Sequence, residues 1–200
     1  MTNVLTAVVL AFVGFRIFGG TRLLGRAEVR HHVLEIVRGL RPRHFLWCWP
    51  VLVAVLVTAF ALIQIPGLSW GWWSALGGVG TPVLGVSKHT AHSPLEWIVP
   101  AVFVVMLVPA LPLFAESEER MFRQGAENWS AARRIRRCVE FGLAHALIGI
   151  PIGVALALSI GGGYFMWRYL RGGIAESTRA HLAYNVTIFA FVGVGLLLGL

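Results

Sequence analysis

Three polar clusters in the second half of this 200-residue chain carry side chains capable of acid–base chemistry. The first is the sequence EERMFR, which begins at Glu118. The second pairs Phe141 with His145, and the third pairs His181 with Asn185, each at a spacing of four residues. Hydrolysis of an amide bond requires a base for water, hydrogen-bond donors for the developing oxyanion and an acid for the leaving amine. A carboxylate, two imidazoles and a side-chain amide can supply these functions.

In the first cluster, we expect one helix to carry both a structural ion pair and a carboxylate that is free for chemistry. Glu119 and Arg123 stand at positions i and i+4, where an ion pair forms readily. Adjacent residues of a helix point about 100° apart, so Glu118 lies on another face and is free for chemistry. The alternative interpretation is a solvated, charged helix end just outside a membrane.

The two histidine clusters have structural alternatives as well. His145 can be a buried histidine bonded to a neighbouring helix, and His181 with Asn185 can join helices through hydrogen bonds. As functional residues, His181 and Asn185 share one helix face and can donate hydrogen bonds to a single point. Ionisable groups at membrane depth are costly, which makes each of them a candidate functional residue.

The composition indicates that these clusters belong to a membrane protein. Hydrophobic residues make up 57% of the chain and charged residues 13%, which excludes a disordered chain and disfavours an ordinary soluble domain. In a soluble domain the net charge of +8 would indicate nucleic acid binding. Here the arginines flank long apolar stretches, so we expect a lipid bilayer as the partner and no nucleic acid.

The apolar stretches predict an all-α fold, a polytopic transmembrane helical bundle forming one membrane domain over residues 1–200. Its N-terminal part, 1–95, contains the first spans and a basic cytoplasmic stretch, and 96–200 contains the three polar clusters. The expected long spans are residues 4–18, 46–65, 95–114 and 180–200. In the third of these, Pro109 and Pro112 are expected to kink or break the helix.

Arginine content predicts the orientation of this bundle. The arginine-rich stretches 16–44 and 116–137 should face the cytoplasm. The nearly uncharged loop 66–94 should face outward, where Trp70, Trp72 and Trp73 would form an interfacial aromatic belt.

Two topologies compete for the segment 138–170. As one continuous span, it would place His181 on the outer face, about 30 Å from Glu118, and no shared site could exist. If Gly149–Pro151 breaks the helix, the chain enters and returns as a hairpin, which keeps more arginines on the cytoplasmic side. We predict the broken-helix hairpin near residues 148–151, with the polar clusters near the cytoplasmic face.

Taken in order, the three clusters resemble the motif set EExxxR, FxxxH and HxxxN of the CPBP intramembrane proteases. This family comprises the CAAX prenyl endopeptidases and their bacterial bacteriocin-processing or Abi relatives. From the composition alone, the set arises by chance at a rate of about one in a thousand. The resemblance covers the chain from about Glu116 to the C-terminus.

This resemblance implies an intramembrane glutamic protease in a bacterial or archaeal cytoplasmic membrane. Its substrate would be a membrane-adjacent or lipidated peptide or protein. The implied roles are Glu118 as the base for water, His145 as a second group on that water, and His181 with Asn185 as the oxyanion site. The implied structural supports are Glu119, Arg123 and Phe141.

Other uses of the same residues compete with this prediction. Glu118, His145 and His181 could hold zinc with an open position, but no HExxH motif is present and we expect no cofactor. A serine or cysteine nucleophile is disfavoured because no GxSxG motif occurs. The alternative function is a catalytically silent CPBP-fold membrane protein that acts as a binding, scaffold or toxin-immunity subunit. A third reading is an unrelated small membrane protein whose polar residues only join helices.

Overall fold

The computed structural model describes residues 2–72 and 94–197, and this part of the chain forms helices and turns without a strand. The predicted all-α class is therefore confirmed for the described residues. The α-helices are α1 (Thr2–Leu23), α2 (Ala27–Arg38), α3 (Pro42–Ile63), α5 (Pro94–Arg123), α6 (Ala131–Ala144) and α7 (Ile152–Leu197). Two short 3₁₀ helices, η1 (Ala126–Asn128) and η2 (His145–Ile148), flank α6.

One of the described helices, α3, is long and apolar enough to cross a membrane. It has 22 residues, of which five are buried: His44, Cys48, Leu52, Val55 and Ala59. The polytopic arrangement with several spans remains a prediction. Of the expected outward-facing loop, Trp73 and most of its neighbours lie outside the described residues, whereas Trp72 donates a hydrogen bond to the carbonyl oxygen of Ala146.

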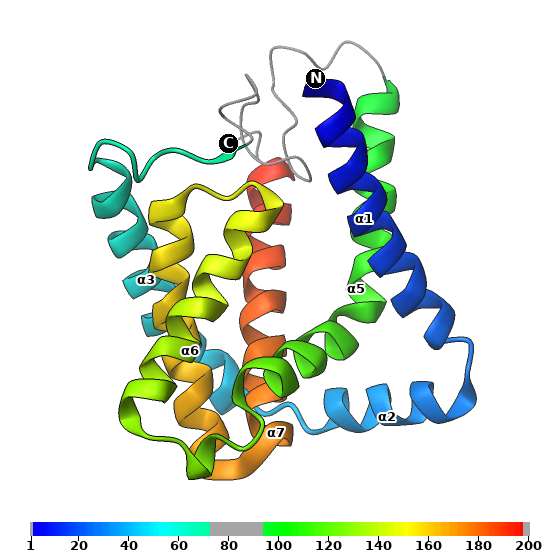
Figure 1. The fold of residues 1–200 in the computed structure, drawn as a ribbon. Coiled ribbons are helices and arrows are strands. Elements are labelled where there is room, and N and C mark those ends of the chain that lie inside the picture. The colour runs from blue at the N-terminus through cyan, green and yellow to red at the C-terminus, as the bar shows by residue number, and fades with distance from the viewer. Residues whose placement is uncertain (1, 73–93, 198–200) are drawn as a thin grey trace.

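Helices α3, α6 and the two halves of α7 pack side by side, while α5 inclines toward them and α1 lies against α5 (Figure 1). Helix α2 lies crosswise at one end. The main core joins α3, α5, α6 and α7 through buried apolar and aromatic side chains, among them Cys48, Phe122, Phe141, Phe165 and Tyr184. Burial of such large aromatic groups supplies about 1.5–3 kcal/mol each.

The predicted break near 148–151 is confirmed. Helix α6 ends at Ala144, a 3₁₀ turn follows, and Gly149 adopts φ +91° before α7 begins at Ile152. A positive φ favours glycine, and Pro151 cannot continue the preceding helix because it lacks an N–H. The chain therefore reverses here, and α6 packs antiparallel to the first half of α7.

A second reversal lies inside α7. Gly172 and Gly173 have non-helical backbone angles, and Gly173 adopts φ +67°. This break divides α7 into two antiparallel halves (Figure 1). The second half consequently starts at the same end of the molecule at which α5 finishes, and the third polar cluster is carried toward the first.

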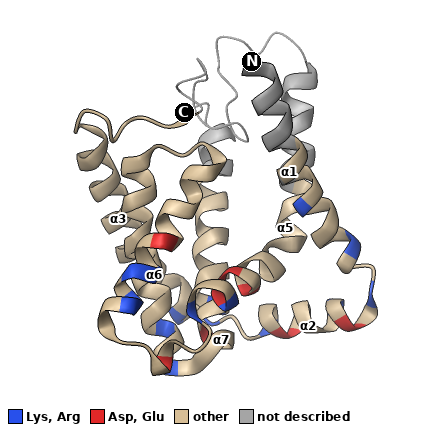
Figure 2. Ribbon diagram, in the orientation of Figure 1, with Lys and Arg blue, Asp and Glu red and all other residues tan. Residues whose placement is uncertain are grey.

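Helix α5 contains both prolines that were expected to kink or break it. It runs unbroken from Pro94 to Arg123, so the prolines do not end it, and it is bent partway along its length (Figure 1). Most charged side chains gather at the end where α5 finishes, α6 begins and α2 lies (Figure 2). We call this the basic end.

Candidate active site

The end of α5 and the second half of α7 bring two glutamates to one histidine. Nδ1 of His181 lies 2.8 Å from Oε1 of Glu119, and Nε2 of the same ring lies 3.8 Å from Oε2 of Glu118. An ionised carboxylate only accepts hydrogen bonds, so His181 donates its Nδ1 proton to Glu119. Nε2 therefore faces Glu118, and a water molecule bound there would contact a potential base and an imidazole together.

The two adjacent glutamates have different environments, as the helical spacing predicts. The Glu118 side chain is 37% exposed, whereas the Glu119 side chain is fully buried. Glu118 is accessible to water and substrate, and Glu119 is available only to its protein neighbours.

Glu119 and Arg123 form the predicted ion pair, at 2.8 Å between Oε1 and Nη1. Both side chains are buried, so a solvated helix end is the wrong interpretation for this pair. Arg123 also donates to the carbonyl oxygen of Gly162 at 3.4 Å. The buried carboxylate of Glu119 thus balances a buried cation and orients His181 through one oxygen atom.

Aromatic rings hold His181 on its remaining sides. Phe165 stacks on the imidazole with ring centroids 4.4 Å apart, and the Phe141 ring lies edge-on at 5.6 Å. The guanidinium of Arg123 lies over the Phe141 ring at 4.5 Å, within cation–π range. Phe141 therefore contacts both the ion pair and the histidine.

His145 contacts the same Phe141 ring that packs against His181. Its ring centroid lies 5.1 Å from that of Phe141, and Nδ1 donates to the Phe141 carbonyl oxygen at 2.9 Å. No hydrogen bond or ion pair joins His145 to Glu118 or His181 in the described part of the chain. His145 and His181 thus both contact the Phe141 ring, and Nε2 of His145 forms no hydrogen bond within the described residues.

Asn185 follows His181 by one turn of α7 and is half-buried. Its position on the same helix face agrees with the expected pairing. Among the hydrogen bonds of the described residues, none uses the Asn185 side chain. Its amide is consequently free to donate to a ligand beside His181.

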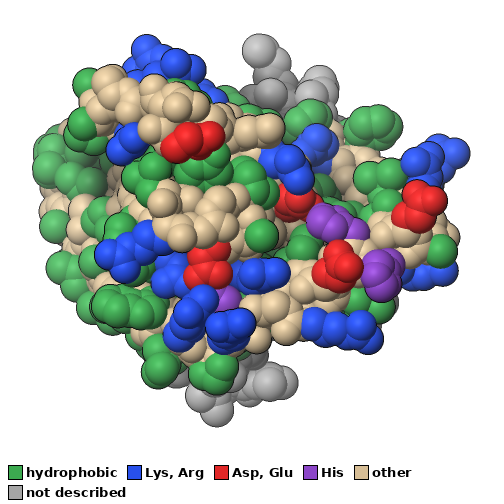
Figure 3. All heavy atoms as spheres, turned by 90° about the horizontal axis from the view of Figure 1, so that it is seen from below, with side chains coloured by type: hydrophobic (Ala, Val, Ile, Leu, Met, Phe, Trp, Pro, Cys, Tyr) green, Lys and Arg blue, Asp and Glu red, His purple; other side chains and the backbone are tan. Residues whose placement is uncertain are grey.

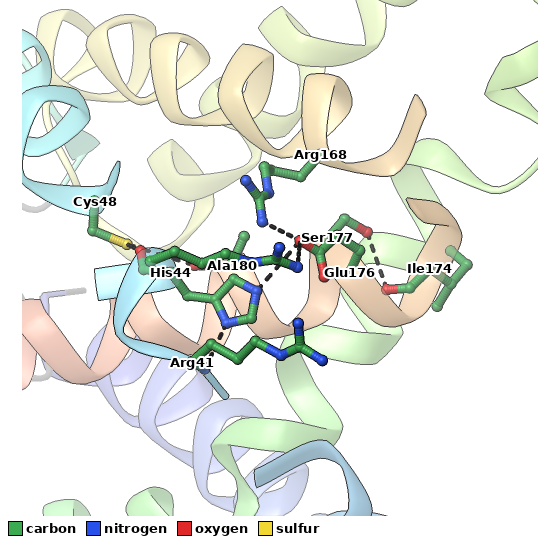
Figure 4. A network of polar contacts seen from close by, with 9 residues as sticks. Arg41, His44, Cys48, Arg168, Ile174, Glu176, Ser177 and Ala180 are labelled. Carbon is green, nitrogen blue, oxygen red and sulfur yellow. Dashed lines mark hydrogen bonds and ion pairs between the residues drawn. The ribbon is translucent and has the colours of Figure 1, made fainter. Parts of the chain in front are cut away.

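A second polar cluster, which sequence analysis missed, lies just after the glycine break in α7 (Figure 4). Oε1 of Glu176 contacts Arg168 from the first half of α7, and Arg43 and His44 from the start of α3, at 3.2 and 3.3 Å for the latter two. Glu176 is the single acidic residue after Glu140, and this isolation among arginines was the available signal. It joins three helical segments at the basic end.

Neighbouring positive charges lower the pKa of the Glu176 carboxyl. Burial works to raise the pKa of this carboxyl, but Arg168, His44 and Arg43 outweigh burial and hold the pKa below its ordinary value of 4.5. Glu176 is therefore ionised at neutral pH.

In the residues that the structure describes, no three His, Cys, Asp or Glu side chains come close enough to hold a metal ion. No family model, curated protein or solved structure matches this chain. The geometry of the site and the motif resemblance are therefore the grounds for a functional proposal.

Proposed function

We propose that this chain is a membrane-embedded glutamic endopeptidase in which Glu118 activates water. The observation that carries the proposal is the convergence on His181 of Glu118 and Glu119, from a helix about sixty residues earlier. Glu119 binds Nδ1 and leaves Nε2 directed at Glu118. A merely structural histidine needs one such partner, and here a second, accessible carboxylate faces the free nitrogen.

The proposed reaction begins with a water molecule held between Glu118 and Nε2 of His181. Glu118 accepts a proton from this water, and the resulting hydroxide attacks the carbonyl carbon of the scissile peptide. The Asn185 amide donates a hydrogen bond to the oxyanion, and Nε2–H of a His181 ring that carries protons on both nitrogens would be the second donor, having first held the water through its oxygen atom. Glu118 then transfers the proton to the leaving amine as the C–N bond breaks, and no covalent intermediate forms.

An apolar groove beside the site suits a substrate that comes from a membrane. A cavity of about 310 Å³ lies between α3 and the two halves of α7, and its lining is apolar apart from the Tyr184 hydroxyl. The Tyr184 ring contacts Phe165, which in turn stacks on His181. An apolar segment or lipid chain of a membrane-adjacent peptide would occupy this groove, with the scissile bond toward Glu118.

The proposed location is an integral membrane position with the basic end in the cytoplasm. Support comes from the apolar helix α3, from its exposed apolar side chains, and from arginines gathered at one end (Figure 2). The candidate site would then open near the cytoplasmic face.

The decisive experiment replaces the proposed base. Glu118→Gln preserves the shape of the side chain but removes its basicity, so cleavage should fall at least 10²-fold. Comparison of protein termini in membranes expressing the wild type or the variant would identify the products. Glu140→Gln is the matched control, because the Glu140 side chain is as exposed as that of Glu118, at 39% against 37%, and pairs with Arg136 and Arg137 on its own helix. Unchanged cleavage in Glu118→Gln would refute the mechanism.

The second candidate function is a catalytically silent membrane protein of the same fold that binds a partner or confers toxin immunity. The hydrogen bond of His145 to the Phe141 backbone, which a purely structural histidine would also make, favours this candidate. A partner-dependent phenotype that survives combined replacement of Glu118 and His145 would support binding over catalysis.

A further inference from the structure

Helix α2 and its two flanking turns expose positive charge that the molecule does not neutralise. Four exposed arginines on α2, beside it and in the last turn of α1 form no ion pair with a carboxylate in the described residues: Arg22, Arg26, Arg38 and Arg41. Of the nearby acidic side chains, Glu35 lies 3.2 Å from His31 and Glu116 lies 2.6 Å from His32, whereas the exposed Glu28 of α2 has no ion pair among the described residues. The unpaired charge on this surface is therefore mainly cationic.

The same helix exposes two apolar side chains on a side that the protein does not cover. Ile36 is buried against Leu111 and Ala115 of α5. Leu34 and Val37 lie about 60° apart on another side of the helix and are 46% and 43% exposed. We call Leu34, Val37 and the four arginines the α2 surface.

The position of α2 is fixed by contacts at both of its sides. Arg30 donates to the carbonyl oxygens of Leu24 and Gly25, at 3.1 and 2.7 Å, and so closes the turn between α1 and α2. His32 ties the helix to α5 through Glu116. The helix lies across the basic end (Figure 1), whose face shows charged, histidine and apolar side chains intermixed (Figure 3).

We propose that the α2 surface binds anionic phospholipid head groups as a helix lying in the plane of the membrane. The arginines would donate paired hydrogen bonds to lipid phosphates, and Leu34 and Val37 would enter the acyl region. Cytoplasmic leaflets carry negative lipids that attract such basic segments. A nucleic acid or free phosphate would satisfy the arginines but leave the two apolar side chains in water, whereas a lipid covers both. This inference needs a bilayer but no peptidase activity.

The first test measures lipid retention by the full-length protein. Native mass spectrometry in detergent, with equal phosphatidylglycerol and phosphatidylcholine, should show preferential retention of phosphatidylglycerol. Arg26→Gln with Arg38→Gln should weaken that retention about tenfold. The control pair Arg133→Gln with Arg136→Gln removes the same charge from exposed positions on α6 and should change retention less than twofold. Equal retention of both lipids, or equal loss in both variants, would overturn the proposal.

The second test needs no loss-of-function variant. A spin-labelled side chain placed at position 34 in reconstituted protein should be accessible to oxygen dissolved in lipid, and one at position 35 to a water-soluble relaxation agent. The opposite pattern, or water accessibility at both positions, would overturn the in-plane orientation. Displacement of phosphatidylglycerol by millimolar inorganic phosphate would identify a free-anion site instead. Both tests are independent of cleavage, so the fate of the peptidase proposal does not decide them.

Discussion

One oxygen atom of Glu119 takes part both in a buried ion pair, which affects the stability of the fold, and in the hydrogen bond that orients His181 for the proposed chemistry. This Oε1 atom contacts Nη1 of Arg123 and Nδ1 of His181, each at 2.8 Å. Removing one member of a buried ion pair leaves an uncompensated charge, whereas replacing both members with apolar groups of similar size is often tolerated. Single and double replacements can therefore distinguish the contribution of Glu119 to stability from its role in positioning His181.

We predict that Glu119→Met alone lowers the free energy of unfolding by about 3–5 kcal/mol, because Arg123 stays buried without its partner. Glu119→Met combined with Arg123→Met should recover most of that loss. Cleavage should stay low in the double variant, since His181 still lacks its Nδ1 partner. Denaturant unfolding in detergent and a cleavage assay on the same samples measure the two effects. Recovery of full activity in the double variant would contradict the positioning role.

Among the elements, α6 and α7 approach closely at Gly162, which packs against α6 without a side chain. A Cβ at Gly162 would lie 2.9 Å from the Cys138 carbonyl oxygen and 3.1 Å from the Phe141 ring. A Cβ at the neighbouring Gly163 would meet no atom within 4 Å. Substitution of Gly162 therefore tests whether the close contact between α6 and α7 positions Phe141, and substitution of Gly163 is its control.

We predict that Gly162→Ala costs about 1–3 kcal/mol of stability by forcing α6 and α7 apart. It should also lower activity, because Phe141 supports His181. Gly163→Ala should be neutral or stabilise the protein by up to about 1 kcal/mol, since alanine favours the helix. Thermal unfolding of both variants tests the contrast, and similar shifts for the two would show that the close approach does not matter.

The break at Gly172–Gly173 depends on Glu176, which fastens the second half of α7 to α3 and to Arg168. A carboxyl whose pKa is lowered by folding stabilises the folded state above its ordinary pKa. That stabilisation is lost as the pH falls through the lower, folded-state pKa. Since the ordinary value is 4.5, the loss belongs to the range below about pH 4.5.

We predict that Glu176→Gln lowers stability by about 3 kcal/mol at pH 7, because Arg168 loses its charged partner. The difference from the wild type should shrink as the pH is lowered below about 4.5. Unfolding curves measured from pH 7 to pH 3 would show the two proteins converging. A difference that stays constant over this range would mean that ionised Glu176 is not the stabilising species.

For the whole molecule, the two chain reversals and the charge distribution predict one topology. Both the glycine break in α7 and the start of α6 lie at the basic end, so they should face the cytoplasm together. Single cysteines at positions 133 and 171 should resist a membrane-impermeant thiol reagent in intact cells. A cysteine at position 65, after α3, should react. Labelling at position 133 or 171 from outside the cell would contradict the proposed topology, either because the orientation is the opposite one or because the protein does not span the membrane.

Much of this architecture was predictable because local chemistry decides it. Apolar composition predicted the helices, Gly149 and Pro151 predicted the reversal after α6, and the i, i+4 spacing predicted the Glu119–Arg123 pair. The prolines Pro109 and Pro112 do not end α5, because a helix can continue past a proline when neighbouring packing compensates for the lost hydrogen bond.

The contacts between distant segments required the tertiary structure. Spacing within a helix fixes which residues share a face, but it does not say which other helix that face meets. The Glu119–His181 bond, the three-segment contact of Glu176 and the contact of His145 and His181 with one Phe141 ring all depend on how the helices pack. The amino-acid order fixes which groups are available for chemistry and where the chain can turn. Packing alone decided which of those groups meet, because side-chain contacts over sixty or more residues depend on the summed geometry of every helix between them.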